Sequence, residues 1–155
     1  MTTRPVRITV VGAGRCDQAT ASVAERVGSE IARRGGVLIC GGLGGVMEAA
    51  ARGAKTAGGL TIGILPGERA DDANPHIDVP IATGMGHARN VVNVRAADAV
   101  VGVGGSYGTV SEIALALKMG IPVVAVSSPL SSDDIVEVDS PEAAVERAFE
   151  LAGAA

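Results

Sequence analysis

The residues best suited to chemistry lie in one short run, residues 101–112, which reads VGVGGSYGTVSE. We predict that a buried strand ends in its glycines and that a helix carrying a glutamate begins after them. Glycines let a ligand approach the backbone closely, and the free N–H groups at a helix start attract negative charge. The run therefore predicts a phosphate-binding loop formed by Gly104, Gly105, Ser106, Tyr107, Gly108 and Thr109.

Glu112, at the end of this run, admits two interpretations. Thr109 and Glu112 fit the T-x-x-E pattern of a capping box, in which both side chains satisfy free N–H groups at a helix start. Alternatively, Glu112 is a general acid or base, or binds sugar hydroxyls, while the loop holds a phosphate. A carboxylate inside a phosphate loop would repel the ligand, so the second interpretation requires Glu112 to face the sugar. The residues alone leave both interpretations open.

The segment before the same strand supplies a cation. Residues 84–90 read GMGHARN and open a predicted helix, which places Arg89 in a first turn, where the helix dipole disfavours positive charge. An anion is expected to compensate Arg89, either the ligand phosphate or Glu112, and a solvated arginine is the alternative. Asn90 is a candidate binding residue beside it. Asn93 is a further candidate on this helix, whereas Arg95 is expected to be a solvated or interface charge.

Other predicted strands also end in glycines. In open α/β sheets ligands bind beyond the carboxyl ends of the strands, so these ends are candidate ligand contacts. Tight turns favour glycine in any case, but its recurrence at four strand ends favours a binding edge. The candidates outside residues 101–112 are Gly12, Gly14, Gly41, Gly42, Gly44, Met47, Pro66 and Gly67, of which Met47 also suits the core.

The elements that would position these residues alternate along the chain. Apolar runs predict strands at 6–11, 37–40, 60–65, 99–103 and 123–126, and helices are predicted at about 18–34, 44–57, 87–97, 109–119 and 141–152. Unbroken apolar strands suit a parallel sheet covered on both faces. We therefore expect a doubly wound, Rossmann-like α/β fold, with residues 1–155 forming a single domain. Residues 68–80 and 127–140 are predicted to be loops.

Missing motifs and composition exclude several ligand classes. Gly12 and Gly14 begin a dinucleotide fingerprint, but its third glycine is absent and Cys40 and Gly41 stand where an acidic residue would bind ribose, which argues against NAD. No P-loop motif occurs. A net charge of −4, one tyrosine, one phenylalanine and no basic cluster argue against a nucleic-acid partner.

The location expected from the sequence is the cytoplasm. The chain has no apolar run of about 18 residues, which excludes a membrane partner, and little sequence precedes the first strand, which argues against a signal peptide. Cys16 and Cys40 match no metal-binding spacing, so we expect reduced structural thiols and no metal site.

The motifs resemble those of one superfamily. Residues 41–50 (GGLGGVMEAA), 61–67 (TIGILPG) and 104–112 (GGSYGTVSE) are similar to the Lonely Guy phosphoribohydrolases and the molybdenum cofactor carrier proteins. The resemblance covers about residues 6–126. For the hydrolases, which cleave the N-glycosidic bond of a cytokinin nucleoside 5′-monophosphate, it implies a catalytic pair at Arg89 and Glu112. It also implies that Gly105, Gly108 and Thr109 hold the phosphate.

This sequence departs from the hydrolase pattern P-G-G-x-G-T-x-x-E and its upstream M-x-x-R-K. Val103 replaces the proline, the glycine loop is longer by one residue, and Asn90 replaces the lysine. The short chain and residues 81–90 are more similar to the cofactor carriers, a branch that implies binding without turnover.

The expected function is therefore binding of a phosphorylated small molecule, either a nucleotide-like molecule such as AMP or a molybdenum cofactor. The alternative is a phosphoribohydrolase that acts on nucleoside 5′-monophosphates. A second alternative is a structural or regulatory oligomer that binds no ligand. Similar proteins imply a homo-oligomer, dimer or tetramer, packed through helices.

Overall fold

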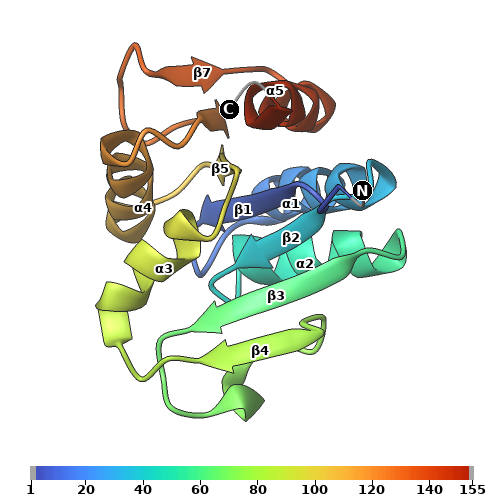
Figure 1. The fold of residues 1–155 in the computed structure, drawn as a ribbon, viewed down its shortest axis with the longest axis vertical. Coiled ribbons are helices and arrows are strands. Elements are labelled where there is room, and N and C mark those ends of the chain that lie inside the picture. Colours follow the sequence, from blue (N-terminus) through green and yellow to red (C-terminus); the bar gives the residue numbers. More distant parts are fainter. Residues whose placement is uncertain (1–2, 154–155) are drawn as a thin grey trace.

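Parallel strands form one sheet through the centre of the molecule (Figure 1). The computed structural model describes residues 3–153, and in this part of the chain the sheet has seven strands in the order β4-β3-β2-β1-β5-β6-β7. The strands are β1 (Arg7–Gly12), β2 (Val37–Cys40), β3 (Leu60–Leu65), β4 (Val79–Ala82), β5 (Ala99–Val103), β6 (Val123–Val126) and β7 (Ile135–Glu137). The helices are α1 (Gln18–Arg33), α2 (Val46–Thr56), α3 (Arg89–Arg95), α4 (Tyr107–Lys118) and α5 (Pro141–Gly153), with short 3-10 turns η1 (Ala70–Asp72) and η2 (Gly86–Ala88).

Helices cover both faces of the sheet, which is why the central strands are apolar throughout. The helices α1, α2 and α5 pack together on one face, and α3 and α4 pack together on the other. In the view of Figure 1, α1 and α2 lie behind the strands. Every residue of β2 and β5 is buried. Burial of these side chains on both faces is the main favourable contribution to folding.

The connections reverse beside β1. The chain adds β2, β3 and β4 on one side of β1, then returns to place β5 on the other side. The helix after β1 lies on one face, and the helix after β5 lies on the opposite face. Such a switch point opens a crevice at the carboxyl ends of the two strands, where ligands of open α/β sheets bind. The glycines after β1 and β5 lie at this crevice.

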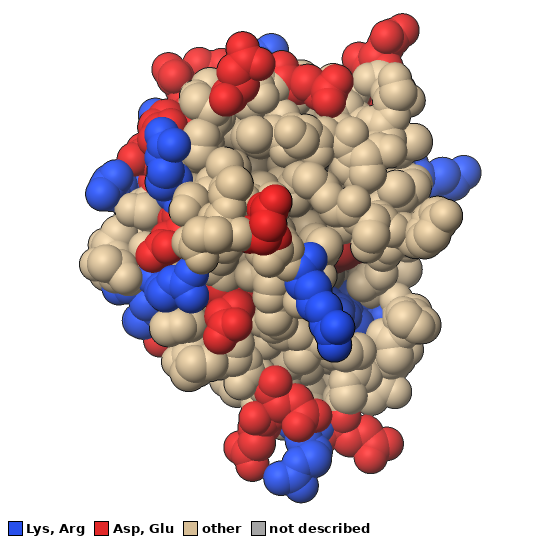
Figure 2. All heavy atoms as spheres, turned by 180° about the vertical axis from the view of Figure 1, so that it is seen from behind, with Lys and Arg blue, Asp and Glu red and all other residues tan. Residues whose placement is uncertain are grey.

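The surface behind the sheet carries charges of both signs. In Figure 2, which views the molecule from behind, Lys and Arg side chains are interspersed with Asp and Glu. Arg26 of α1 pairs with Glu142 of α5, and Arg52 of α2 pairs with Glu25 of α1. These pairs are exposed, so each contributes little to stability. No helix within residues 3–153 is long and apolar enough to cross a membrane.

The predicted α/β fold is confirmed, whereas two loop predictions are wrong. Each predicted helix and strand is present, with ends shifted by no more than two residues. The predicted loop at 68–80 contains η1 and the first two residues of β4, and the predicted loop at 127–140 contains β7. Both missed strands are edge strands of three or four residues. Apolar runs of only three or four residues, one of them interrupted by Pro80, are too short to indicate a strand from sequence alone.

Two glycines let α1 and α2 meet backbone to backbone. A Cβ added at Gly28 would overlap the carbonyl oxygen of Ala50, and one added at Gly53 would overlap the carbonyl oxygen of Glu25. We expect Gly28→Ala to lower the free energy of unfolding by about 1–2 kcal/mol, because rigid backbone must move apart. Urea unfolding measures this change. Gly153→Ala is the control, since a Cβ there has no neighbour within 4 Å; wild-type stability of Gly28→Ala would contradict the contact.

Candidate functional site

The glycine loop after β5 has a backbone that only glycine adopts easily. Gly104 and Gly105 have φ angles of 56° and 128°, and a Cβ on Gly105 would overlap the Thr109 side chain. The helix α4 begins at Tyr107, with Ser106 as its N-cap. The free N–H groups at this helix start therefore lie directly beside two glycines. This arrangement can hold an anion.

The capping box of α4 differs from the predicted one. The Ser106 N–H donates to Thr109 Oγ1 at 3.3 Å, so the box joins Ser106 to Thr109. Thr109 is buried, and its hydroxyl already has this partner. The predicted box between Thr109 and Glu112 is wrong because the helix begins two residues earlier than expected. Glu112 thus lies one turn inside the helix, and the capping interpretation of Glu112 is corrected.

The Glu112 carboxylate is held by a buried amide on the neighbouring helix. Asn93 of α3 is fully buried, and its Nδ2 donates to Glu112 Oε2 at 2.6 Å. The backbone carbonyl oxygen of Asn93 accepts a hydrogen bond of 2.7 Å from Thr9 Oγ1 of β1. Burial raises the pKa of the Glu112 carboxyl, and the Asn93 hydrogen bond and the Arg89 charge oppose this rise. Glu112 therefore retains its proton to a higher pH than a solvated glutamate does.

Arg89, the first residue of α3, extends over the end of β2. A Cβ added at Gly41 would overlap the Arg89 guanidinium and the Met47 sulfur, so glycine makes room for both. Burial lowers the pKa of Arg89, and the charge of Glu112 opposes this decrease. Its Nε atom is buried and has no hydrogen-bond partner within residues 3–153. Arg89 is thus not the solvated side chain that was one alternative, and its interaction with Glu112 is a through-space attraction.

Cys40, the last residue of β2, lies close to Arg89 and Glu112. Its thiol is buried, accepts a hydrogen bond from the Gly42 N–H at 3.4 Å, and donates to the Met47 carbonyl oxygen at 3.8 Å. Burial raises the pKa of the Cys40 thiol to about 12. The thiol is therefore neutral near pH 7 and is not a nucleophile. No group of His, Cys, Asp and Glu in the described part of the chain could hold a metal ion.

Comparisons with known proteins place the chain in a family. Residues 5–152 match the model of the SLOG cluster4 family. The chain belongs to this family. It is 52% identical over 140 residues to an uncharacterized protein of Archaeoglobus fulgidus, an alignment that covers 90% of this chain and 92% of that protein.

Solved structures similar to this SLOG cluster4 chain include molybdenum cofactor proteins. The molybdenum cofactor binding protein of Rippkaea orientalis has a TM-score of 0.92 and 38% identity, covering 97% of this chain and 99% of that one. The Moco carrier protein of Chlamydomonas reinhardtii has a TM-score of 0.87 and 35% identity, covering 98% and 100%. The resemblance to the cofactor carrier branch is therefore confirmed.

Several predicted binding residues of this SLOG cluster4 chain also have structural roles. A Cβ at Gly12 would overlap the Val46 side chain, and one at Gly44 would lie 3.1 Å from the Gly14 carbonyl oxygen. The loop after β1 therefore packs against the loop after β2. Met47 is buried in the core, as its alternative prediction stated.

Pro66 and Gly67 hold the segment that leads to α3. Their carbonyl oxygens accept hydrogen bonds from the Gly86 N–H at 2.9 Å and the Gly84 N–H at 2.8 Å. The two residues thus orient the backbone that ends at Arg89. Tyr107, by contrast, is 94% exposed at the start of α4. A ligand role for all the predicted site residues remains a prediction, namely for Gly12, Gly14, Gly41, Gly42, Gly44, Met47, Pro66, Gly67, Arg89, Asn90, Gly104, Gly105, Ser106, Tyr107, Gly108, Thr109 and Glu112.

Asn93 is the residue whose importance the sequence understated. It was a secondary candidate beside Arg89, yet it is the only side chain among the described residues that donates a hydrogen bond to Glu112. The available signal was an asparagine within the apolar run 91–94, since an amide among apolar residues is expected to be buried and to need partners. Its Oδ1 atom is buried without a partner in the described structure, like Arg89 Nε. The site therefore contains one unsatisfied donor and one unsatisfied acceptor.

Proposed function

We propose that the chain binds a phosphorylated small molecule, nucleotide-like or of the molybdopterin type, at the carboxyl edge of the sheet. The observation that carries this proposal is the unsatisfied pair, Arg89 Nε and Asn93 Oδ1, beside Glu112. A buried polar atom without a partner costs about 1–3 kcal/mol, so folded proteins retain few of them. Arg89 as a whole is only half-buried, so the exposed part of its side chain can bind an anionic ligand, whereas the fully buried Asn93 orients Glu112.

The charge distribution supports an anionic ligand. Arg89 is a partly buried cation at this edge, and the start of α4 contributes N–H groups beside Gly104 and Gly105. Glu112 would oppose an anion if it were ionised, but burial raises its pKa, so it retains its proton to a higher pH than a solvated glutamate does. A protonated Glu112 can donate a hydrogen bond to a ligand oxygen instead of repelling it.

The similar proteins support the choice of ligand class. The proteins of Rippkaea orientalis and Chlamydomonas reinhardtii are described as a binding protein and a carrier of the molybdenum cofactor, and both align over nearly the whole chain. We infer cargo of the same chemical class here, a pterin that bears a phosphate. The cytoplasm, where such cargo would be transferred, remains the proposed location.

Thermal unfolding with and without ligand tests the proposal. AMP and the molybdenum cofactor, added separately to the purified chain, distinguish a nucleotide from a pterin ligand. A ligand that binds the folded state alone, at about 100 times its Kd, stabilises it by about 2.7 kcal/mol and raises Tm measurably. An unchanged Tm with both compounds at millimolar concentration would refute the proposal.

A phosphoribohydrolase is the second candidate, and the environment of Glu112 favours it. A carboxyl group with a raised pKa beside an arginine suits a general acid that protonates a leaving base. Incubation with AMP, followed by chromatography for adenine and ribose 5-phosphate, tests this candidate. Base release that disappears in Glu112→Gln would favour the hydrolase over the carrier, and binding of AMP without base release would exclude it.

We also propose that the chain forms a homodimer through an apolar surface beside α3. Val79 and Ile81 of β4 pair in register with Ile62 and Ile64 of β3, so they share the face that α3 covers. They lie beyond the reach of α3 and are 42% and 43% exposed, and Val91 on α3 is 41% exposed. Clustered apolar side chains of this kind mark interaction surfaces. A second copy would cover them and the free edge of β4 at once.

Replacing Ile81 with aspartate tests the dimer. We expect the wild-type chain to have twice the mass of one chain in light scattering after gel filtration, and Ile81→Asp to have the mass of one chain, because the charge would be buried unpaired. Tyr107→Asp is the control, since Tyr107 is exposed away from β4. A monomeric wild-type chain at high micromolar concentration would contradict the interface.

A further inference from the structure

A separate pocket lies at the carboxyl edge of the sheet, on the face opposite Glu112. One wall is formed by Ala19, Thr20 and Val23 in the first two turns of α1. The ends of β5 and β6 form the rest, with Val103, Gly104, Val126 and Ser127. Its cavity volume is about 170 Å³. No residue of α4, the helix that carries Glu112, lines the pocket.

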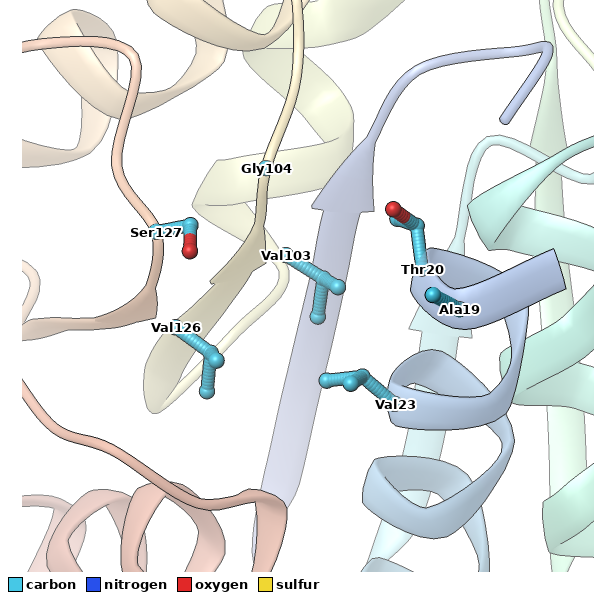
Figure 3. Close-up of a pocket in the computed structure, with 7 residues that line it drawn as sticks. All are labelled: Ala19, Thr20, Val23, Val103, Gly104, Val126 and Ser127. Carbon is cyan, nitrogen blue, oxygen red and sulfur yellow. The ribbon is translucent and has the colours of Figure 1, made fainter. Parts of the chain in front are cut away.

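The pocket walls are apolar, and its rim is polar. Figure 3 shows the side chains of Val23, Val103 and Val126 converging below the opening, with Thr20 and Ser127 on opposite sides. All the lining side chains are uncharged, so a charged group would lose its hydration there without compensation. The two hydroxyl groups can each donate or accept a hydrogen bond. The pocket therefore suits an uncharged, compact group with polar atoms at its edge.

The pocket is too small for a whole nucleotide or cofactor. Sites for drug-sized ligands have volumes of about 300–1,000 Å³, so this pocket has room for one part of such a molecule. Gly104 belongs both to the pocket wall and to the glycine loop before α4. The Gly104 N–H donates to the Val126 carbonyl oxygen at 3.0 Å, which fixes the two strand ends relative to each other. One ligand can therefore contact the loop and the pocket together.

We infer that this pocket receives the uncharged heteroaromatic ring of the ligand whose phosphate lies on the glycine loop. The inference rests on the proposed binding function and adds to it the place of the ring. Flat bicyclic rings, purine or pterin, have apolar faces for the valines and polar edges for Thr20 and Ser127. Neither aromatic residue of the chain lines the pocket, so aliphatic contacts hold the ring.

A ring in this pocket has a consequence for the chemistry. The pocket lies in the layer of α1, whereas Glu112 faces Asn93 in the layer of α3 and α4. The ring is then on the opposite face of the sheet from the Glu112 carboxyl. A carrier needs no catalyst at the bond that joins the ring to the rest of the ligand, whereas a phosphoribohydrolase requires one. Ring binding here therefore favours a carrier.

Filling the pocket tests the inference. In Ala19→Leu a larger side chain enters the cavity from α1, and leucine suits a helix, so folding is retained. Ser22→Leu places the same side chain on the exposed side of α1 and is the matched control. Calorimetric titration compares AMP and 6-hydroxymethylpterin phosphate, which carry a ring, with ribose 5-phosphate, which carries none. The two ring compounds also show whether purine or pterin fits.

We expect Ala19→Leu to weaken binding of the better ring compound by at least about tenfold and to change ribose 5-phosphate binding by less than about twofold. Thr20→Val, which removes one rim hydroxyl with little change in shape, should lower the affinity for the same ring compound by about threefold. Wild-type affinity of both variants for the ring compounds would overturn the pocket assignment while leaving the proposed function intact. If the unmodified chain binds none of the three compounds, the proposed function fails and the pocket assignment fails with it.

Discussion

Arg89→Met is expected to weaken binding of the phosphorylated ligand by about 100-fold, which corresponds to about 2.7 kcal/mol. The variant removes a partly buried cation and the unpartnered Nε donor in one change. Hydrogen bonds from a charged donor to an anion contribute about 1.5–3 kcal/mol each, more than neutral ones. Calorimetric titration with the compound that raises Tm most gives the two affinities.

One further variant separates the charge of Arg89 from its geometry, and a variant of a second arginine on the same helix is the control. Arg89→Lys keeps the charge but loses Nε and the planar group, so we expect a loss of about tenfold. Arg95→Met removes an exposed arginine at the end of the same helix and should change affinity by less than about twofold. If Arg89→Met binds as tightly as Arg95→Met, the unsatisfied Nε does not mark a ligand site.

The sequence predicted the elements of the fold because its signals are local. Apolar β-branched runs and the glycines that follow them located the five interior strands of the sheet, with ends correct to within one residue. The edge strands β4 and β7 were missed because their neighbours in the sheet define them, and Pro80 in β4 argues against a strand from sequence alone. Pairing at an edge depends on tertiary contacts that no short window contains.

The sequence predicted which residue types gather at the carboxyl edge of the sheet but not the contacts between them. Arg89 and Glu112 were named from their positions in a first turn and after a glycine loop, and both lie at the carboxyl edge. The hydrogen bond from Asn93 to Glu112 joins residues 19 apart on different helices, which no spacing rule connects. The start of α4 shifted because Ser106 and Thr109 form a capping box that competes with the predicted pair. Because the helix begins two residues earlier than expected, Glu112 lies beyond the capping positions and accepts a hydrogen bond from Asn93 instead.

Glu112→Gln is expected to stabilise the ligand-free protein above pH 4.5, because the buried carboxyl of Glu112 resists ionisation, whereas a glutamine carries no charge and keeps an acceptor for Asn93. The folded pKa of Glu112 lies above its ordinary value of 4.5. The contribution of Glu112 to the stability of the wild-type chain is thus fully present below pH 4.5 and is lost as pH rises through the folded pKa. The stability difference between variant and wild type should be near zero at pH 4, grow as pH rises above 4.5, and level off once pH exceeds the folded pKa. Urea unfolding across this range measures it.

Asp98→Asn is the control with the opposite sign. Hydrogen bonds from Arg4, and then from Arg7, hold the pKa of Asp98 well below its ordinary value of 3.8. Its contribution to stability is present above pH 3.8 and is lost as pH falls, so Asp98→Asn should destabilise at pH 7 and progressively less below pH 4. A Glu112→Gln profile parallel to that of Asp98→Asn would mean that Glu112 is ionised and compensated in the folded chain. The carboxyl would then repel a phosphate, and the ligand would have to bind through Arg89 and the glycine loop without it.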